Sequence, residues 1–213
     1  MSVDQRVATI GDLGVLTRSW RLHLEAANLS PRTVQSYTDA AVRLRDFLAD
    51  QGMPTAVTAI SREHVEAFIS DQLDRHAPAT AGVRYRSLQQ LFRWLEEEGE
   101  IERSPMARMR PPKLPEKLVP VYSQDELRAL LAACAGRDFE ARRDLALFRV
   151  FIDTGARVAE IAGLRWDPED EDRRDLDLGQ RELLVMGKGS RPRVLRIGTS
   201  TAQPLDRYLR IRP

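Results

Sequence analysis

A stretch dense in proline divides this chain into two parts. Between Arg103 and Ser123 the sequence reads RSPMARMRPPKLPEKLVPVYS, with five prolines and no helical or strand periodicity. Proline lacks an amide hydrogen and fixes φ, so at this density it continues neither an α-helix nor a central β-strand. We therefore expect two domains joined by a semi-extended linker, with boundaries at residues 10–102, 103–122 and 123–213.

The first hundred residues predict four amphipathic helices with short connections, a pattern typical of a compact bundle. In each segment the apolar residues recur mainly at helical spacing. Ser30 followed by Pro31 is a helix start, and Gly52 and Gly99 are expected helix terminators. The residues of the first helix that carry its pattern are Leu16, Trp20, Leu22 and Leu24. The expected inward residues of the fourth are Tyr85, Leu88, Leu91, Phe92 and Leu95.

The second part mixes helices with a β-hairpin. Ser123 and Glu126 have the spacing of a capping box, and the apolar run at 145–152 predicts a more buried helix behind it. The acidic stretch 167–177 is expected to be a loop. Two β-type runs then flank a glycine-rich turn at 187–190, and a last helix follows. The predicted fold is mainly α with a small β-hairpin or sheet.

Cysteine content and hydropathy limit the classes of protein that fit. The single cysteine, Cys134, excludes a disulfide or a cysteine-type zinc site within one chain. No apolar stretch approaches the roughly 20 residues that cross a bilayer, and the first twenty residues lack a signal peptide's apolar core. We therefore expect a cytoplasmic protein. The formal net charge of +1 does not by itself indicate a polyanionic partner.

Arg157 is the first candidate for chemistry. It follows Gly155, which is expected to end a helix in the left-handed conformation, and Glu160 lies one helical turn further on. Either Arg157 and Glu160 form an ordinary surface ion pair, or Glu160 orients the guanidinium to bind an anion such as phosphate. The spacing alone leaves both interpretations open.

Lys188 is the second candidate, at the tip of the predicted hairpin between Gly187 and Gly189. A lysine on such a turn can donate a proton to a ligand, and it also suits a solvated turn. The order of the features is more specific than either residue. A buried helix is followed by T-G-x-R-x-x-E, by an acidic loop and by a hairpin with G-K-G.

The sequence resembles the tyrosine recombinases, also called phage-type integrases. The motifs that carry the resemblance are TGARVAE at 154–160, LRW at 164–166, GKG at 187–189 and RPR at 191–193. The helix starting LSPRTVQSY and the segment PATAGVRYRSLQQLFRWL are similar to that family's core-binding domain, and the resemblance covers residues 10–210. It implies a four-helix SAM-like bundle joined by the proline-rich linker to an α+β catalytic domain, the two clamping duplex DNA.

The resemblance also implies a mechanism. In this family a tyrosine attacks a phosphodiester to form a 3′-phosphotyrosyl link, and neither a metal nor a nucleotide cofactor is needed. Carried over by motif, Arg157 is the first catalytic arginine, Glu160 supports it, and Lys188 is the general acid. The implied partners are a duplex recombination site and further recombinase protomers on the DNA, with no membrane and no small-molecule substrate.

Two elements of the family have no counterpart in these residues. The family's second box, a histidine followed three residues later by an arginine, comes after the hairpin, yet no histidine lies beyond His76. The nucleophilic tyrosine comes later still, and the spacing of Tyr208 with Leu205 and Leu209 predicts helix packing instead. We expect an incomplete catalytic domain that does not cleave DNA alone. The helix at 145–152 and the hairpin should then expose apolar surface.

The sequence leaves three candidate functions. The first is a site-specific recombinase, present as a truncated chain or a fragment. The second is a non-catalytic DNA-binding derivative, which occupies a site or regulates a full-length recombinase, or a decayed relic. The third, a helical interaction module with no nucleic-acid role, is disfavoured by the joint motifs.

Expected DNA contacts come from the polar faces of the second and fourth helices and from the hairpin, where arginine, threonine, serine and glutamine suit phosphates and base edges. The competing interpretation of these faces is simple solvation. The expected contacts are Arg32, Thr33, Ser36, Arg43, Thr80, Arg84, Arg86, Ser87, Gln90, Arg191 and Arg193.

Overall fold

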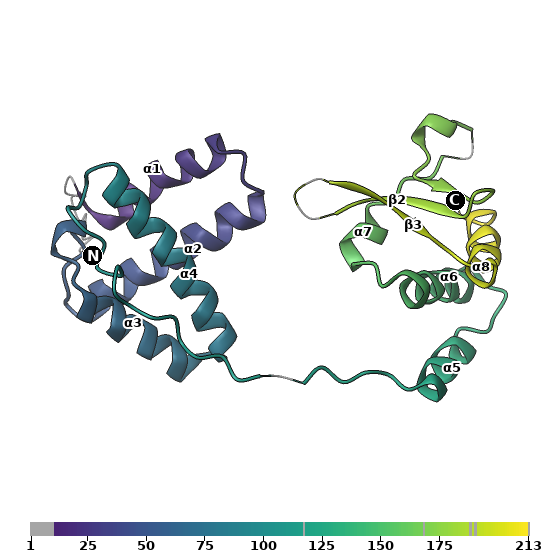
Figure 1. Ribbon diagram of the computed structural model, residues 1–213, viewed down its shortest axis with the longest axis horizontal. Helices are drawn as coiled ribbons and strands as arrows, with labels where there is room; N and C mark the ends of the chain where they lie inside the picture. Colours follow the sequence, from purple (N-terminus) through teal and green to yellow (C-terminus); the bar gives the residue numbers. More distant parts are fainter. Residues whose placement is uncertain (1–10, 117, 168, 188, 190, 213) are drawn as a thin grey trace, which may run out of the picture. The chain divides into compact units, whose positions relative to one another are not determined.

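The structure, a computed structural model, describes residues 11–116, 118–167, 169–187, 189 and 191–212 (Figure 1). The chain divides into two compact units, residues 1–118 and 119–213. Helices are the main regular elements of both units, and the second unit adds a three-stranded sheet. The mainly helical fold with a small sheet that the sequence predicts is confirmed.

The first unit is a helical bundle. Its described elements are α1 (Leu13–Ala26), α2 (Pro31–Asp50), the 3-10 helix η1 (Val57–Ala59), α3 (Arg62–Arg75) and α4 (Pro78–Glu97). Helix α2 begins as predicted, because the Ser30 hydroxyl accepts a hydrogen bond from the Thr33 amide and Pro31 is the first helical residue. Gly52 and Gly99 follow α2 and α4 with left-handed φ angles of 66° and 75°, which glycine adopts without steric cost.

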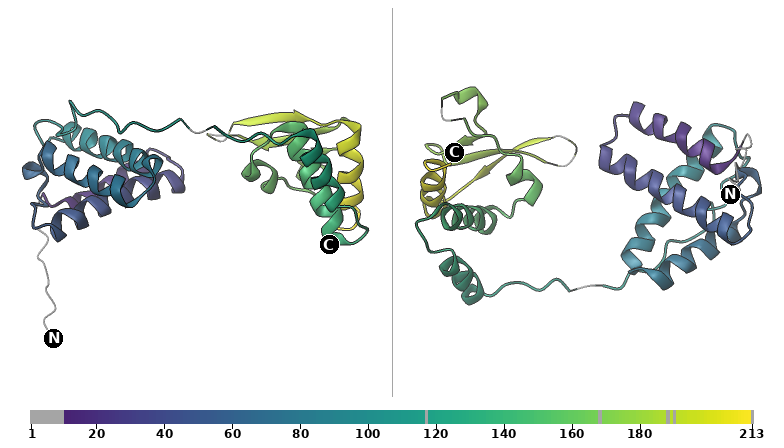
Figure 2. Two further views of the ribbon diagram at one scale, coloured as in Figure 1. Left: turned by 90° about the horizontal axis from the view of Figure 1, so that it is seen from below. Right: turned by 180° about the vertical axis from the view of Figure 1, so that it is seen from behind.

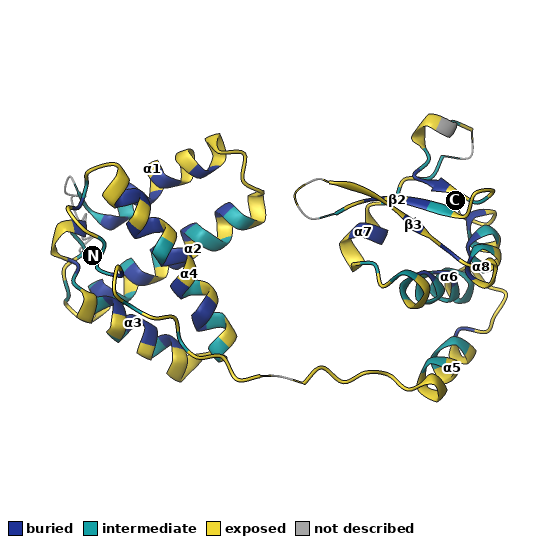
Figure 3. Ribbon diagram, viewed as in Figure 1, coloured by how far each residue is buried: buried dark blue, intermediate teal, exposed yellow. Residues whose placement is uncertain are grey.

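The bundle core lies where the four helices face one another (Figure 3). All five residues predicted to face inward from α4 are fully buried. The largest of the other buried side chains include Trp20 and Phe68. Leu22, which the apolar pattern of the first helix included, is 68% exposed, because it lies off the stripe that Leu16, Trp20 and Leu24 form at spacings of four.

The first half of the proline-rich segment packs on the bundle. Met106 is buried in the bundle core, and Met109 packs against that core. Leu114 Cδ2 lies 3.3 Å from the position that a Cβ would take on Gly82 of α4, so the missing side chain leaves room for the leucine. Met106 and Met109 thus leave water, and Leu114 does so in part, at 48% exposure. Leu118, four residues further on, is 89% exposed.

The second unit packs helices on one face of an antiparallel sheet. Its described elements are α5 (Gln124–Ala133), α6 (Phe139–Thr154), α7 (Val158–Ala162), the 3-10 helix η2 (Glu171–Arg173), β1 (Leu176–Asp177), β2 (Glu182–Met186), β3 (Pro192–Arg196) and α8 (Thr199–Leu209). The strand order is β1-β2-β3, and α6 and α8 lie side by side (Figure 2). The predicted hairpin corresponds to β2 and β3. The predicted acidic loop is wrong in part, because it contains β1, whose buried Leu176 pairs with Leu183.

The core of the second unit is smaller and leaves apolar side chains in solvent. Val150 of α6 and Leu183 of β2 are among its buried residues, whereas Ile152 of α6 is 43% exposed. Helix α6 is therefore less buried than its sequence predicts. On the outer face of the sheet Leu184 and Val194, which face each other across the hairpin, are also exposed. Apolar surface is thus exposed on both the helix and the hairpin.

The docking of Leu114 on Gly82 predicts a local protection from proteolysis. We expect Leu114→Ser to speed tryptic cleavage after Lys113 about fivefold, because half-burying a leucine is worth about 1 kcal/mol. Leu118→Ser, at an exposed position of the same segment, is the matched control and should leave that rate unchanged. Mass spectrometry of timed digests measures both. Equal acceleration by the two substitutions would contradict the docking of this segment.

Candidate functional site

The backbone between α6 and α7 presents Arg157 at the surface. Helix α6 ends at Gly155, whose φ is 60°, as the sequence predicts. No atom lies within 4 Å of a Cβ built on Gly155, so the left-handed conformation and not a lack of space requires glycine there. The Thr154 hydroxyl donates to the Val150 carbonyl at 2.6 Å and accepts from the Ala156 amide at 3.2 Å. These contacts fix the chain just before Arg157.

Glu160 is the centre of the site. Its side chain is only 3% exposed, and both of its carboxylate oxygens accept hydrogen bonds. Oε1 accepts from Arg157 Nη1 at 2.8 Å, and Oε2 accepts from the Arg157 amide and from Arg193 Nη2, each at 2.8 Å. Arg157 itself is 67% exposed. The pair is therefore not a solvent-exposed ion pair, because a buried carboxylate holds an arginine that faces outward.

The hydrogen bonds to Glu160 keep it ionised. The bond from the Arg157 backbone amide, followed by the bond from the Arg193 guanidinium, lowers the pKa of Glu160 from 4.5 to about 2, although burial acts in the opposite direction. The carboxylate thus carries its negative charge at every physiological pH. That charge fixes the position of two guanidinium groups.

The β2–β3 turn lies against the same carboxylate. The Gly187 amide donates to the Arg191 carbonyl at 2.8 Å and closes the turn. A Cβ on Gly187 would stand 3.2 Å from that carbonyl oxygen and 3.8 Å from Glu160 Oε1, so a side chain would crowd the turn. Arg191 is exposed. Lys188, the predicted general acid, lies outside the described residues.

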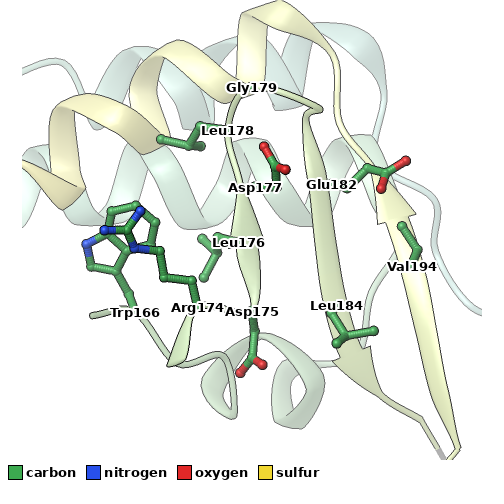
Figure 4. Close-up of a pocket in the computed structure, with 10 residues that line it drawn as sticks. All are labelled: Trp166, Arg174, Asp175, Leu176, Asp177, Leu178, Gly179, Glu182, Leu184 and Val194. Carbon is green, nitrogen blue, oxygen red and sulfur yellow. The ribbon is translucent and has the colours of Figure 1, made fainter. Parts of the chain in front are cut away.

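A second arginine–carboxylate pair, which the sequence did not reveal, supports the loop before the sheet. Asp175 accepts from the Arg165 amide at 2.8 Å and from its guanidinium Nε and Nη2, each at 3.0 Å. The Arg165 side chain is the largest cause that lowers the pKa of Asp175. The guanidinium of Arg174 lies over the ring of Trp166 (Figure 4). It is 5.0 Å from the ring centroid. Ten residues separate Arg165 from Asp175, so no periodic signal announces the pair.

The pocket in Figure 4, with a volume of about 620 Å³, lies along the outer face of the sheet. Leu184 and Val194 line it, whereas Leu183 and Val185, the neighbours of Leu184 in β2, face the core. Its lining is part apolar and part acidic. The cluster around Glu160, rather than this pocket, is the candidate site of the second unit.

In the first unit, the predicted contacts of α2 share one helix face. Arg32, Ser36 and Arg43 are spaced four and seven residues apart, which places them in one row along the helix. Asp39 lies in the same row and adds a negative charge. Thr33 lies beside the row, and its hydroxyl is 2.8 Å from that of Ser30 at the helix start.

The predicted contacts of α4 do not come together. Arg84 is half-buried and donates to Gln72 of α3, whose amide nitrogen donates to Asp71. Burial lowers the pKa of Arg84, and the nearby positive charge of Arg43 lowers it further. Ser87 is 1% exposed and donates to the Val83 carbonyl, so its hydroxyl is not available at the surface.

The remaining predicted residues of α4 lie apart from Arg84. Arg86 and Gln90 are exposed, one and two turns beyond Gly82, on the side of α4 that the proline-rich segment covers. Thr80 is partly buried in the first turn of the helix. Of the residues predicted on α4, only Arg84 therefore has a charge close enough to interact with the row on α2, at Arg43.

Two family models match the chain. The N-terminal SAM-like domain of phage integrase matches residues 16–100, and the phage integrase family matches residues 120–212. The tyrosine recombinase XerD of Lacticaseibacillus casei is 32% identical over 84% of this chain and 58% of its own length. The tyrosine recombinase XerC of Chlorobaculum tepidum is 28% identical over 90% of this chain and 62% of its own length. The chain belongs to the tyrosine recombinase family.

This tyrosine recombinase chain spans about three fifths of the length of those curated relatives. A lambda integrase tetramer bound to a Holliday junction has a TM-score of 0.72, with 20% identity, and the match covers 97% of this chain and 59% of that one. An integrase of the transposon Tn1549 in complex with a circular intermediate DNA has a TM-score of 0.69, with 14% identity, over 95% of this chain and 66% of that one. These likenesses show a shared fold.

No described helix is long and apolar enough to cross a membrane. Within the same part of the chain, histidine, cysteine, aspartate and glutamate side chains do not gather in groups that could hold a metal ion.

The lowered pKa of Glu160 predicts a pH dependence of stability. The folded pKa of about 2 lies below the ordinary 4.5, so the stability that Glu160 contributes is complete above about pH 4.5 and is lost as the pH falls towards 2. We expect Glu160→Gln to reduce the proton uptake on unfolding of the second unit by about one proton in this range. Urea unfolding followed by circular dichroism at several pH values measures this uptake.

Glu169→Gln, in the exposed part of the acidic loop, is the matched control for that measurement. It removes one carboxylate from the same unit without touching the arginine cluster. An unchanged proton uptake in Glu160→Gln would show that the carboxylate is not held as the structure describes.

Proposed function

We propose that this chain binds duplex DNA in site-specific recombination, with Arg157 engaging a backbone phosphate at the reaction centre. The observation that carries the proposal is the ionised, buried Glu160, which holds the Arg157 amide and Nη1 while 67% of the arginine side chain stays exposed. A guanidinium fixed in this way loses little rotamer freedom on binding and matches the geometry of phosphate oxygens. Membership of the tyrosine recombinase family supports the same role, as do the structural neighbours whose structures hold bound DNA.

The proposed chemistry follows from the types of side chain. Arg157 would stabilise the negative charge that develops on the phosphate during strand cleavage by a 3′-phosphotyrosyl route. Gly187 lies beside Glu160, and Lys188 follows Gly187 in the sequence. We propose that Lys188 protonates the leaving oxygen. Arg191 adds an exposed positive charge at that turn.

In the first unit we propose that the row on α2, together with Arg84, contacts the DNA backbone. Arg43 and Arg84 are close enough for each charge to act on the other, and Gln72 and Asp71 hold Arg84 from one side. A phosphate near the two arginines would relieve their repulsion. Asp39 opposes this contact and is proposed to weaken it.

We further propose that this chain does not cleave DNA alone. The Tyr208 ring is half-buried in α8, and its centroid lies 5.7 Å from that of Phe139 in α6, which supports a packing role. The packing of Tyr208 also favours a second candidate function, a non-catalytic DNA-binding protein that occupies a site or regulates a full-length recombinase. Either function places the protein with its DNA, in the cytoplasm.

A salt titration tests DNA binding. We expect the affinity for duplex DNA to fall with salt concentration, and Arg43→Gln to reduce the logarithmic slope by about 0.9, the share of one phosphate contact. Asp39→Asn, in the same row, is the matched control of opposite sign and should raise the affinity. Fluorescence anisotropy of a labelled duplex measures both. An affinity that does not change with salt would rule out the proposed phosphate contacts.

A nicked suicide substrate tests cleavage. On a duplex that carries a recombination site and a nick, we expect no covalent adduct between this chain and the DNA on a denaturing gel. Tyr208→Phe should behave like the unchanged chain. An adduct that forms with the unchanged chain and disappears in Tyr208→Phe would identify Tyr208 as a nucleophile and contradict its packing role.

A further inference from the structure

We propose that Arg193 is a positioning residue, which acts through Glu160 to hold the β2–β3 turn and Arg157 in one fixed arrangement and does not itself bind a phosphate. The inference rests on the proposed function in one respect, the role of Arg157 in DNA binding. It differs from the role that the sequence suggests for Arg193, which is a direct DNA contact from the hairpin.

The register of the hairpin directs Arg193 towards the inside of the unit. Arg193 pairs with Val185, which is buried, whereas the next pair, Leu184 and Val194, faces outward. Because side chains alternate along a strand, Arg193 leaves β3 on the face where the core and α7 lie. Its Nη2 then reaches Glu160 Oε2 at 2.8 Å, although 33 residues separate the two.

This bond connects the start of α7 with the β2–β3 hairpin. On one side Glu160 binds the amide and the guanidinium of Arg157, which are fixed by the α6–α7 connection. On the other side it binds Arg193, and Gly187 lies against its Oε1. Gly187 directly follows β2, and Arg193 lies in β3 near the base of the turn. The carboxylate therefore sets the distance between Arg157 and the turn.

The exposure and the charges of the three side chains support a positioning role for Arg193 rather than phosphate binding. Glu160 is almost completely buried, whereas Arg193 is 45% exposed and Arg157 is 67% exposed. The more exposed arginine has more of its surface free to meet a phosphate. A single buried negative charge between two arginines also needs both of them, because losing one leaves a buried carboxylate partly uncompensated. Arg193 thus completes the environment of Glu160, and Arg157 faces the solvent.

The first experiment measures the turn in the protein without DNA. We expect Arg193→Gln to speed amide hydrogen exchange at Gly187 and in α7 about tenfold, the effect of losing one charged hydrogen bond. Arg193→Lys, which keeps the charge, should restore part of the protection. Arg191→Gln removes the same charge from the same turn and is the matched control, with exchange within about twofold of the unchanged chain. Equal exchange in Arg193→Gln and Arg191→Gln would overturn the proposal.

The second experiment measures DNA affinity in a double-mutant cycle. Arg193→Gln should weaken binding of a duplex about threefold in the unchanged chain, at the lower end for residues in one hydrogen-bond network, and have no effect when Arg157→Gln is already present. The salt slope should not change. A loss that persists in the Arg157→Gln background, with a slope lower by about one, would identify Arg193 as a phosphate contact and overturn the proposal.

The two experiments separate the two proposals. If the unchanged chain showed no salt-dependent binding to duplex DNA, the proposed function would fail. The exchange measurement needs no DNA and would still decide whether Arg193 positions the turn.

Discussion

The second unit is organised around a buried negative charge. A carboxylate that leaves water loses its hydration, and it remains ionised only where donors replace the water molecules. Glu160 meets this condition with three hydrogen bonds, which come from two segments far apart in sequence. In the folded unit this carboxylate therefore holds the α6–α7 connection and the hairpin together, and Arg157 keeps 67% of its side chain exposed.

Two glycines, one on each side of the carboxylate, are needed for different physical reasons. Gly155 has open space around it and is required for its left-handed φ, which turns the chain from α6 to Arg157. Gly187 does not have a left-handed φ. Glycine is required there because a side chain would press on the Arg191 carbonyl. Any residue larger than glycine would disturb the site at both positions, through torsional strain at the first and through contact at the second.

The parts of the structure that depend on near neighbours in sequence were predictable. Ser30, the capping box of Ser123 with Glu126, and Gly155 were all identified from local patterns, and so were the helices and the hairpin. The ion pair of Arg157 with Glu160 also lies within one turn. Its burial did not follow from spacing, because exposure depends on what the rest of the unit packs against it.

Contacts between distant residues were not predictable in the same way. Arg193 pairs with Glu160 across 33 residues, and Asp175 pairs with Arg165 across a loop, so neither pair has a period to detect. Serine is a residue type that often contacts DNA, yet the Ser87 hydroxyl donates its hydrogen bond to a carbonyl of its own helix. The docking of the proline-rich segment depends on Leu114 meeting Gly82, and nothing in a run of prolines shows where it will pack.

The segment beyond Leu114 has a consequence for how the two units cooperate. Eight residues, 115–122, join Leu114 to Ser123, and covalent geometry limits their reach to at most about 30 Å. Once one unit has bound a ligand that both can contact, the other is confined within this radius of it. A short tether of this kind gives an effective concentration in about the millimolar range. Two units that each bind weakly can then bind tightly as a pair, and a lengthened tether would lower that joint affinity without altering any contact.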